Sequence, residues 1–477
     1  MSQKIKMRDM VVILPGITGS VLQKDGKDIW DVSGKAIWKV LSNLGNSIQE
    51  LKLTQDDPIA ESLGDGIKAT RIIEDTHLIP GLVKIDGYTK TSRLITDNFD
   101  VISGNIYEDA DDKAANFYHF PYDWRRDIRA NARLLKRLID KRLKRWIEYS
   151  GAEDAKVIIL AHSMGGLVSR YYLEVLQGWR DCKALFTFGT PYRGSVKVID
   201  FLANGYKELF VDLTEVMGSL TSIYQLLPIY EILQIGDEYH RIAETDNIPN
   251  IDKTRAADAL AFHREIEAAV NRNIKDENYK NDFTTIPIIG IQQPTLQSAL
   301  LANGKLTVSE ENPKILQSRP DLSDGDGTVP LVSAIPIELS HSFNNNFIAE
   351  THSSLQNQSQ TLENLLNCLK VSQFNLKTVR ASQSAISVSL DDLYLASQPI
   401  EMRARVINSF HGKLKAKITP VSHSENILNL DFKEQEKEWV LAIDNLKPGL
   451  YRLQVETDNL GEEAPTPVHD LFEVVNV

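Results

Sequence analysis

Short, mainly apolar runs recur through the first 300 residues of the chain. They occupy residues 9–16, 157–160, 184–188 and 286–291, and glycine or proline lies in or beside most of them. Continuous apolar runs of this length are typical of strands that are buried on both faces of a parallel sheet. We therefore predict a mainly parallel central β-sheet.

A helical periodicity precedes the second of these runs. Apolar residues recur every three or four positions from residue 128 to 149, which predicts an amphipathic helix and, with the flanking strands, a βαβ unit. The segment is also basic, with ten Lys or Arg and two acidic residues between Arg125 and Arg145. Its basic face is expected to contact either water or the surface of a membrane.

The pattern becomes helical and irregular between residues 195 and 282. Apolar residues gather there on both sides of Pro228. An insertion of this size between two sheet strands is expected to form a cap or lid, and its apolar face can also simply pack on the domain beneath.

Strict alternation of apolar and polar residues begins after a helical segment at 362–369. It is clearest in 400–406 and 450–455, and a Lys-Pro-Gly turn precedes the second segment. Alternation with period two predicts half-buried antiparallel strands. We expect an immunoglobulin-like β-sandwich over residues 376–477 and a catalytic α/β domain over residues 1–375. The sandwich carries no cluster of catalytic residue types, so binding, contact with the lid or assembly is expected of it.

Composition excludes several classes of protein. The chain has 477 residues, of which 42% are hydrophobic and 25% are charged, as in ordinary globular proteins of two or three domains. A net charge of −12 argues against general nucleic-acid binding. Two cysteines, Cys182 and Cys368, form neither a disulfide framework nor a zinc site. The first ten residues lack the apolar run of a signal peptide, so we expect a cytoplasmic protein, with peripheral membrane contact left open.

A candidate nucleophile follows the run at 157–160. Residues 161–165 read Ala-His-Ser-Met-Gly and lead into a helix-forming stretch. A serine hydroxyl is a weak nucleophile at neutral pH, so an enzyme holds it on a tight turn where a base reaches it. Ala161 stands where the usual pattern has glycine. The arrangement predicts a nucleophile elbow with Ser163 as the catalytic serine.

An acid and a histidine follow the serine along the chain in α/β-hydrolases. Asp326, in the turn Gly-Asp-Gly-Thr-Val, is the preferred acid and Asp324 is the alternative. Calcium binding is the competing interpretation of this turn, but no distal glutamate completes an EF-hand. His352 follows a strand-like segment at 347–350 and is the candidate base. No motif for a cofactor or a metal accompanies these residues.

Stabilisation of an oxyanion requires preorganised N–H donors. We expect one from the backbone of Met164 and the other from Ile17, in the loop at 15–20. A phosphate-binding loop is excluded there, because no Gly-Lys-Ser or Gly-Lys-Thr follows the glycines.

Six segments together resemble the lecithin:cholesterol acyltransferase family, whose relatives include lysosomal phospholipase A2 and the phospholipid:diacylglycerol acyltransferases. They are residues 14–20, 121–125, 161–166, 189–195, 325–330 and 351–352. The resemblance covers roughly residues 9–370. It implies an α/β-hydrolase fold with Ser163, Asp326 and His352 as a triad and Ile17 and Met164 at the oxyanion hole. It also implies an acyl-serine formed from a fatty acyl ester and released to water or to an alcohol.

Three features depart from the family. The chain lacks the cysteines that hold a lid by a disulfide in many relatives, the insertion after Ser195 aligns poorly, and the carboxyl-terminal sandwich lies outside the resemblance. We expect a lipase- or phospholipase-type hydrolase or an acyltransferase whose partner is a lipid or another acyl ester. The alternatives are an esterase of small soluble esters and an inactive binding or scaffold protein. The protein partner of the sandwich stays open.

Overall fold

The computed structural model describes residues 4–31, 45–73, 76–79, 83–108, 114–208, 211–339, 346–370, 385–407, 412–422, 425–435, 438–444, 446–458 and 464–476. The predicted boundary at 375/376 lies outside these ranges. Every helix within them is too short or too polar to cross a bilayer.

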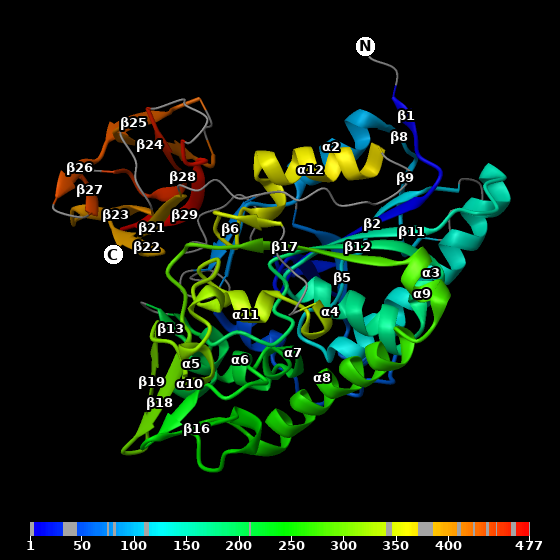
Figure 1. The fold of residues 1–477 in the computed structure, drawn as a ribbon, viewed down its shortest axis with the longest axis horizontal. Helices are drawn as coiled ribbons and strands as arrows, with labels where there is room; N and C mark the ends of the chain where they lie inside the picture. The colour runs from blue at the N-terminus through cyan, green and yellow to red at the C-terminus, as the bar shows by residue number, and fades with distance from the viewer. Residues whose placement is uncertain are drawn as a thin grey trace.

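A seven-stranded parallel sheet forms the centre of the larger domain (Figure 1). Its strands, in spatial order, are β20 (Phe347–Ile348), β17 (Thr284–Gly290), β12 (Cys182–Phe188), β11 (Val157–His162), β2 (Met10–Leu14), β10 (Phe117–His119) and β9 (Ser103–Asn105). Every neighbouring pair is parallel. The prediction of an α/β-hydrolase fold with a mainly parallel sheet is confirmed.

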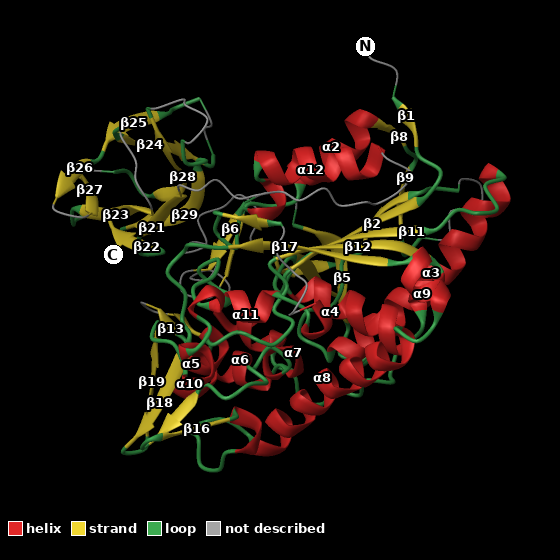
Figure 2. Ribbon diagram, viewed as in Figure 1, coloured by secondary structure: helices red, strands yellow, loops and turns green. Residues whose placement is uncertain are grey.

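Both faces of the sheet are covered by helices, which explains the continuous apolar runs. Met10, Val12 and Leu14 point into a core shared with α3 (Ile128–Ser150) and α4 (Met164–Arg170). Val11 and Ile13 point into a second core, shared with α2 (Thr89–Asn98) and α12 (Ser359–Lys370). Figure 2 shows the two helix layers on opposite sides of the sheet.

Two arginines of the basic helix α3 are buried and find their partners inside the molecule. It begins after Asp127, which caps it by accepting from the N–H of Arg129, and ends at Gly151 in the left-handed conformation. The Arg129 guanidinium pairs with Asp127, Asp258 and Glu265, while Arg142 donates to backbone carbonyls. These buried arginines are therefore structural, and the membrane-surface alternative stays a prediction.

The insertion between β12 and β17 combines helices with short strands. It contains α5 (Lys197–Asn204), β13 (Lys207–Glu208), β14 (Val211–Asp212), α6 (Thr214–Ser219), α7 (Thr221–Tyr224), β15 (Leu233–Ile235), β16 (Glu238–His240), α8 (Lys253–Asn273) and α9 (Glu277–Asp282). Strands β18 (Ser298–Ala302) and β19 (Lys305–Ser309) come after β17, yet β18 pairs with β15. The predicted cap at 195–282 is therefore joined by residues 298–309, which lie after the sheet strand β17.

Further short elements complete the larger domain. The strands are β1 (Ile5–Lys6), β3 (Ser20–Lys24), β4 (Lys27–Trp30), β5 (Ile67–Ile72), β6 (His77–Ile79), β7 (Val83–Ile85) and β8 (Phe99–Asp100). The helices are α10 (Lys314–Gln317), α11 (Leu331–Ala334) and the segments η1 (Gly45–Leu51), η2 (Tyr171–Val175), η3 (Gly178–Arg180), η4 (Ile242–Glu244), η5 (Pro320–Leu322), η6 (Ile337–Leu339) and η7 (Leu355–Asn357). Strands β4-β3-β5 form a small antiparallel sheet that the sequence analysis did not predict.

The carboxyl-terminal region forms two packed sheets. One contains β21 (Ala385–Ser389), β23 (Ile400–Ile407), β27 (Glu438–Ile443) and β26 (Lys433–Gln435). The other contains β22 (Leu393–Leu395), β29 (Val468–Val475), β28 (Gly449–Thr457), β24 (Leu414–Pro420) and β25 (Leu428–Asp431). Inward-facing residues of both sheets share one core, which includes Met402, Leu453 and Phe472. The predicted all-β sandwich is confirmed.

Candidate active site

Ser163 lies on a strained turn between β11 and α4. Its φ is +50° and its ψ is −124°, a conformation that L-residues rarely adopt. The turn fits only because small residues follow it. A Cβ on Gly165 would come 2.4 Å from the carbonyl oxygen of Pro15, and one on Gly166 would come 1.9 Å from Thr190 Oγ1. The local sequence thus presents the serine hydroxyl at the carboxyl end of the sheet.

The structure brings Ser163, His352 and Asp326 together, although they are far apart in sequence. His352 Nε2 lies 3.0 Å from Ser163 Oγ, and its Nδ1 lies 2.7 Å from Asp326 Oδ2. Ser163 and His352 are each 8% exposed and Asp326 is 1% exposed. A base that is bonded to both a hydroxyl and a buried carboxylate is the arrangement that activates a serine.

Backbone groups hold the Asp326 carboxylate in place. Its Oδ1 accepts from the N–H groups of Thr328 at 3.0 Å and Val329 at 2.7 Å. The N–H of His352 also donates to the carbonyl of Asp326 at 2.8 Å. Asp324 is placed differently, because its carboxyl accepts from the adjacent N–H of Gly325. Burial raises the pKa of Asp324 to about 6. The geometry therefore favours Asp326 as the partner of the histidine.

Gly189 leaves room for the imidazole ring of His352, because it has no side chain. Gly189 follows β12 with a φ of +58°, and a Cβ there would come 2.7 Å from His352 Nδ1 and 2.8 Å from Asp326 Oδ2. A side chain at this position would displace the histidine from its carboxylate.

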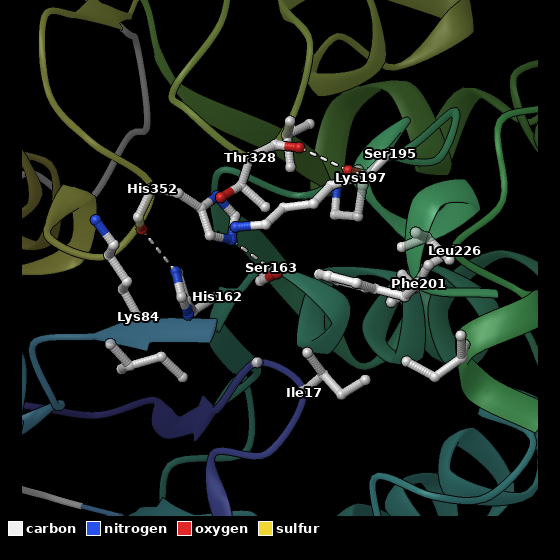
Figure 3. Close-up of a pocket in the computed structure, with 16 residues that line it drawn as sticks. Ile17, Lys84, His162, Ser163, Ser195, Lys197, Phe201, Leu226, Thr328 and His352 are labelled. Carbon is white, nitrogen blue, oxygen red and sulfur yellow. Dashed lines mark hydrogen bonds between the residues drawn. The ribbon is translucent and has the colours of Figure 1, made fainter. Parts of the chain in front are cut away.

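The two predicted oxyanion donors lie beside Ser163. Ile17 is in the turn after β2 and lines the same pocket as Ser163 (Figure 3). Met164 is the first residue of α4, where a backbone N–H has no acceptor within the helix. Their role as an oxyanion hole stays a prediction.

A buried hydrogen-bond chain, which the sequence analysis missed, links the Ile17 loop to His352. The N–H of Gly16 donates to Tyr88 Oη at 2.8 Å, and this hydroxyl lies 3.0 Å from His162 Nδ1. His162 Nε2 in turn lies 3.0 Å from the carbonyl oxygen of His352. Burial raises the pKa of Tyr88. Because the carbonyl of His352 can only accept, a neutral His162 ring donates from Nε2 and accepts from the Tyr88 hydroxyl at Nδ1. His162 adjoins the nucleophile in sequence, whereas nothing near Tyr88 signalled its role.

A mainly apolar pocket opens beside Ser163. Its apolar lining comes from the turn after β2 and from the insertion, and it includes Ile17, Val198, Phe201, Ile223 and Leu226. Lys84 and Lys197 also line it (Figure 3). The pocket is suited to an apolar chain attached to a carbonyl that reacts at the serine.

The sandwich contacts the loop that carries His352, which the sequence analysis did not foresee. Glu350 is fully buried, and its carboxyl accepts from the N–H of His469 at 2.9 Å and lies 2.8 Å from His469 Nδ1. Thr351 Oγ1 donates to the carbonyl of His469 at 2.6 Å. Residues of β29 therefore hold the backbone directly before the histidine. His469 was visible only as one of the histidines in the sandwich.

No set of three or more His, Cys, Asp or Glu side chains in the described ranges is arranged to hold a metal ion.

A family model matches part of the chain. The model of the lecithin:cholesterol acyltransferase family matches residues 111–285, which supports an ester hydrolase or acyltransferase activity. No curated protein matches the sequence.

Three solved structures show low similarity. The propeptide form of the Bacillus licheniformis lipase BlEst2 is 11% identical, with 98% of this chain and 95% of that chain covered and a TM-score of 0.36. The mature form is 12% identical, with coverage of 77% and 95% and a TM-score of 0.34. A Corynebacterium diphtheriae protein described as membrane anchored is 12% identical, with a TM-score of 0.17; the match covers 20% of this chain and 21% of that one. At these TM-scores the similarities say nothing about function. The match to the family model covers residues 111–285, and the fold of the chain is that of an α/β-hydrolase.

Proposed function

We propose that the chain is a serine-dependent ester hydrolase or acyltransferase acting on fatty acyl esters. The observation that carries this proposal is the position of His352, whose two ring nitrogens lie 3.0 Å from Ser163 Oγ and 2.7 Å from Asp326 Oδ2. This geometry supports general-base activation of the serine, and the strained turn at Ser163 is typical of a catalytic nucleophile.

In the first half of the reaction, Ser163 Oγ attacks the ester carbonyl carbon while His352 Nε2 takes its proton. Asp326 orients the imidazole and stabilises the imidazolium that forms. The N–H groups of Ile17 and Met164 hold the negative oxygen of the tetrahedral intermediate, and the loss of one such donor costs about 2.7–4 kcal/mol of transition-state stabilisation. The carbon–oxygen bond to the alcohol then breaks, and His352 returns its proton to the leaving oxygen.

In the second half, the acyl-serine transfers its acyl group. His352 takes a proton from water or from an acceptor alcohol, whose oxygen attacks the acyl carbon, and Ser163 recovers its proton when the tetrahedral intermediate collapses. Hydrolysis and transfer use the same side chains, so the positioning of the acceptor and the exclusion of water determine the product.

The apolar lining of the pocket supports a fatty acyl group over a small acyl group. Phe201, Ile223 and Leu226 offer surface for an aliphatic chain, and each buried methylene contributes about 0.8 kcal/mol of binding. An esterase of small esters would gain nothing from this surface.

The test is hydrolysis of p-nitrophenyl decanoate and p-nitrophenyl acetate by the full chain and by Ser163→Ala. We expect kcat/KM to be higher for the decanoate, and the variant to lose at least about 1,000-fold in kcat. Ser150→Ala, at the end of α3, is the matched control and should retain full activity. A fluorophosphonate probe should label the wild type but not Ser163→Ala. Turnover close to the wild-type rate in the folded Ser163→Ala variant would exclude the proposal. Incubation with a lipid extract, with and without an added alcohol, separates hydrolysis from transfer.

A further inference from the structure

One peptide unit in the loop after β2 is held at both ends by buried tyrosines. It joins Pro15 to Gly16. Tyr122 Oη donates to the carbonyl of Pro15 at 2.8 Å, and the N–H of Gly16 donates to Tyr88 Oη at 2.8 Å. The carbonyl and the N–H of a trans peptide point in opposite directions, so the two hydrogen bonds together fix the rotation of this peptide plane. Tyr88 is 1% exposed and Tyr122 is fully buried, so water does not replace either hydroxyl.

The next peptide unit, between Gly16 and Ile17, takes its orientation from the first. Its carbonyl accepts from the N–H of Gly19 at 3.1 Å. Its N–H, that of Ile17, meets no acceptor among the residues that the structure describes. A Cβ on Gly16 would come 3.0 Å from Ser163 Cβ, so the loop lies directly beside the candidate nucleophile. The loop therefore carries an unused donor next to Ser163, and the direction of this donor depends on the bonds to the preceding peptide.

Tyr88 uses its hydroxyl twice. It accepts from Gly16, and the same oxygen lies 3.0 Å from His162 Nδ1, to which it donates. His162 Nε2 donates in turn to the carbonyl of His352, as the dashed line in Figure 3 shows. A phenylalanine at position 88 would leave both the N–H of Gly16 and Nδ1 of His162 without this partner. Tyr122 makes only the bond to the loop, so the two tyrosines share one contact and differ in the other.

We propose that Tyr88 is a positioning residue of the oxyanion site. By holding the N–H of Gly16, it sets the direction of the N–H of Ile17, which then meets the negative oxygen that forms on the ester carbonyl. This inference rests on the proposed function. An oxyanion donor acts because it is held in place before charge develops, and a displacement of about 1 Å costs about 100-fold in rate. Loss of the Tyr88 hydroxyl should therefore weaken binding of the transition state and leave binding of the ester nearly unchanged.

The test compares wild type with three tyrosine-to-phenylalanine variants, each of which removes one hydroxyl and keeps the ring. Tyr88→Phe releases the N–H of Gly16, and Tyr122→Phe releases the carbonyl at the other end of the same peptide. Tyr451→Phe is the matched control, because this buried tyrosine donates to the carbonyl of Lys447 at 2.6 Å inside the sandwich. Hydrolysis of p-nitrophenyl decanoate gives kcat and KM, and thermal unfolding reports the stability of each variant.

Inhibition by nonyl trifluoromethyl ketone tests the oxyanion site itself. This ketone carries the same alkyl chain as the decanoyl group. Ser163 Oγ adds to its carbonyl carbon while His352 takes the proton, no bond to a leaving group breaks, and the former carbonyl oxygen stays in the place of the oxyanion. A residue that only stabilises the fold would not change the affinity of the folded enzyme for this inhibitor. A residue that positions the oxyanion donor changes that affinity as much as it changes kcat/KM.

We expect Tyr88→Phe to lower kcat by about 10- to 100-fold, because the donor is displaced rather than deleted. KM should change by less than about threefold, since the interaction is made mainly in the transition state. The inhibition constant of the ketone should rise by the same factor by which kcat/KM falls. Tyr122→Phe should show the same pattern. Tyr451→Phe should lower Tm and leave kcat, KM and the inhibition constant unchanged.

Wild-type kcat in folded Tyr88→Phe would overturn the inference, and so would a fall in kcat without weaker binding of the ketone. A loss confined to Tyr88→Phe would also overturn it, because the effect would then pass through His162 to the loop of the base. If Tyr88→Phe does not fold, wild-type constants in Tyr122→Phe would overturn the inference. In each case, turnover by wild type that is lost in Ser163→Ala would leave the proposed function standing. The absence of any Ser163-dependent hydrolysis would instead defeat the proposed function itself.

Discussion

The contact between His469 and Glu350 gives a sharp prediction, because it joins the sandwich to the loop of the candidate base. In His469→Ala, the buried Glu350 carboxyl loses its bond to Nδ1 but keeps the one from the backbone N–H of residue 469. A hydrogen bond to a charged group contributes about 1.5–3 kcal/mol. The His469 side chain is 31% exposed. We therefore expect His469→Ala to lower the free energy of unfolding by about 2 kcal/mol, rather than by the roughly 3–5 kcal/mol that breaking a fully buried pair costs.

The same change should slow catalysis, because Glu350 lies two residues before His352. A displacement of about 1 Å at a reacting group costs about 100-fold in rate, and the surviving backbone bonds limit the movement. We therefore expect kcat to fall by about 10- to 100-fold with KM nearly unchanged. His469→Asn, whose amide can donate in place of Nδ1–H, should restore much of kcat. The assay is hydrolysis of p-nitrophenyl decanoate, with thermal unfolding measured in parallel.

The pH dependence of stability adds a check on the same pair. Burial lowers the pKa of His469, but the carboxylate of Glu350 outweighs burial and the net pKa is raised above 6.5. A raised histidine pKa contributes stability in full below pH 6.5, and this contribution is lost as the pH rises through the folded-state pKa. The difference in Tm between wild type and His469→Ala should be larger at pH 6 than at pH 8.5. Unchanged kcat together with a pH-independent difference in Tm would refute the reasoning.

Two further substitutions test the geometry around His352. Asp326→Asn should reduce kcat by about 10⁴-fold, because the amide favours the wrong imidazole tautomer. Asp324→Asn should keep kcat within about tenfold of wild type. If a p-nitrophenyl ester assay showed the larger loss in Asp324→Asn, Asp324 would be the functional acid. Gly189→Ala should reduce kcat by at least about 100-fold, because its Cβ would meet His352 Nδ1 at 2.7 Å, and the left-handed backbone should cost about 1–2 kcal/mol of stability. Wild-type kcat in this variant, with normal unfolding, would contradict the placement of the imidazole.

The parts of the fold that follow from local pattern could be predicted from the sequence. A strand with the continuous apolar run at 157–160 must be buried on both faces, as in a central parallel sheet. A strand with the alternating pattern at 400–406 is buried on one face only, as in a sandwich. Ser163 has a local signature, and chain order together with the turn at Asp326 and the strand-like segment before His352 selected these two residues as candidates.

Features that depend on long-range packing could not be predicted. Tyr88 and Lys84 look like ordinary residues of loops and strands, and only the folded chain places them beside residues 162 and 470. The pairing of β18 with β15 joins segments on either side of a core strand, so no local periodicity could reveal it. The basic residues of α3 favoured a position at the surface, yet Arg129 and Arg142 are buried in the folded chain.

The chain of hydrogen bonds from Gly16 through Tyr88 and His162 to the backbone of His352 has a consequence for protein engineering. One end of this chain is in the loop of the candidate oxyanion donor Ile17 and the other is the backbone of the candidate base, so a change in the size of the phenol or the imidazole would shift both ends at once. Libraries that aim to alter acceptor preference should therefore randomise positions 88 and 162 as a pair, because improvements found at one position alone will rarely combine additively with those found at the other.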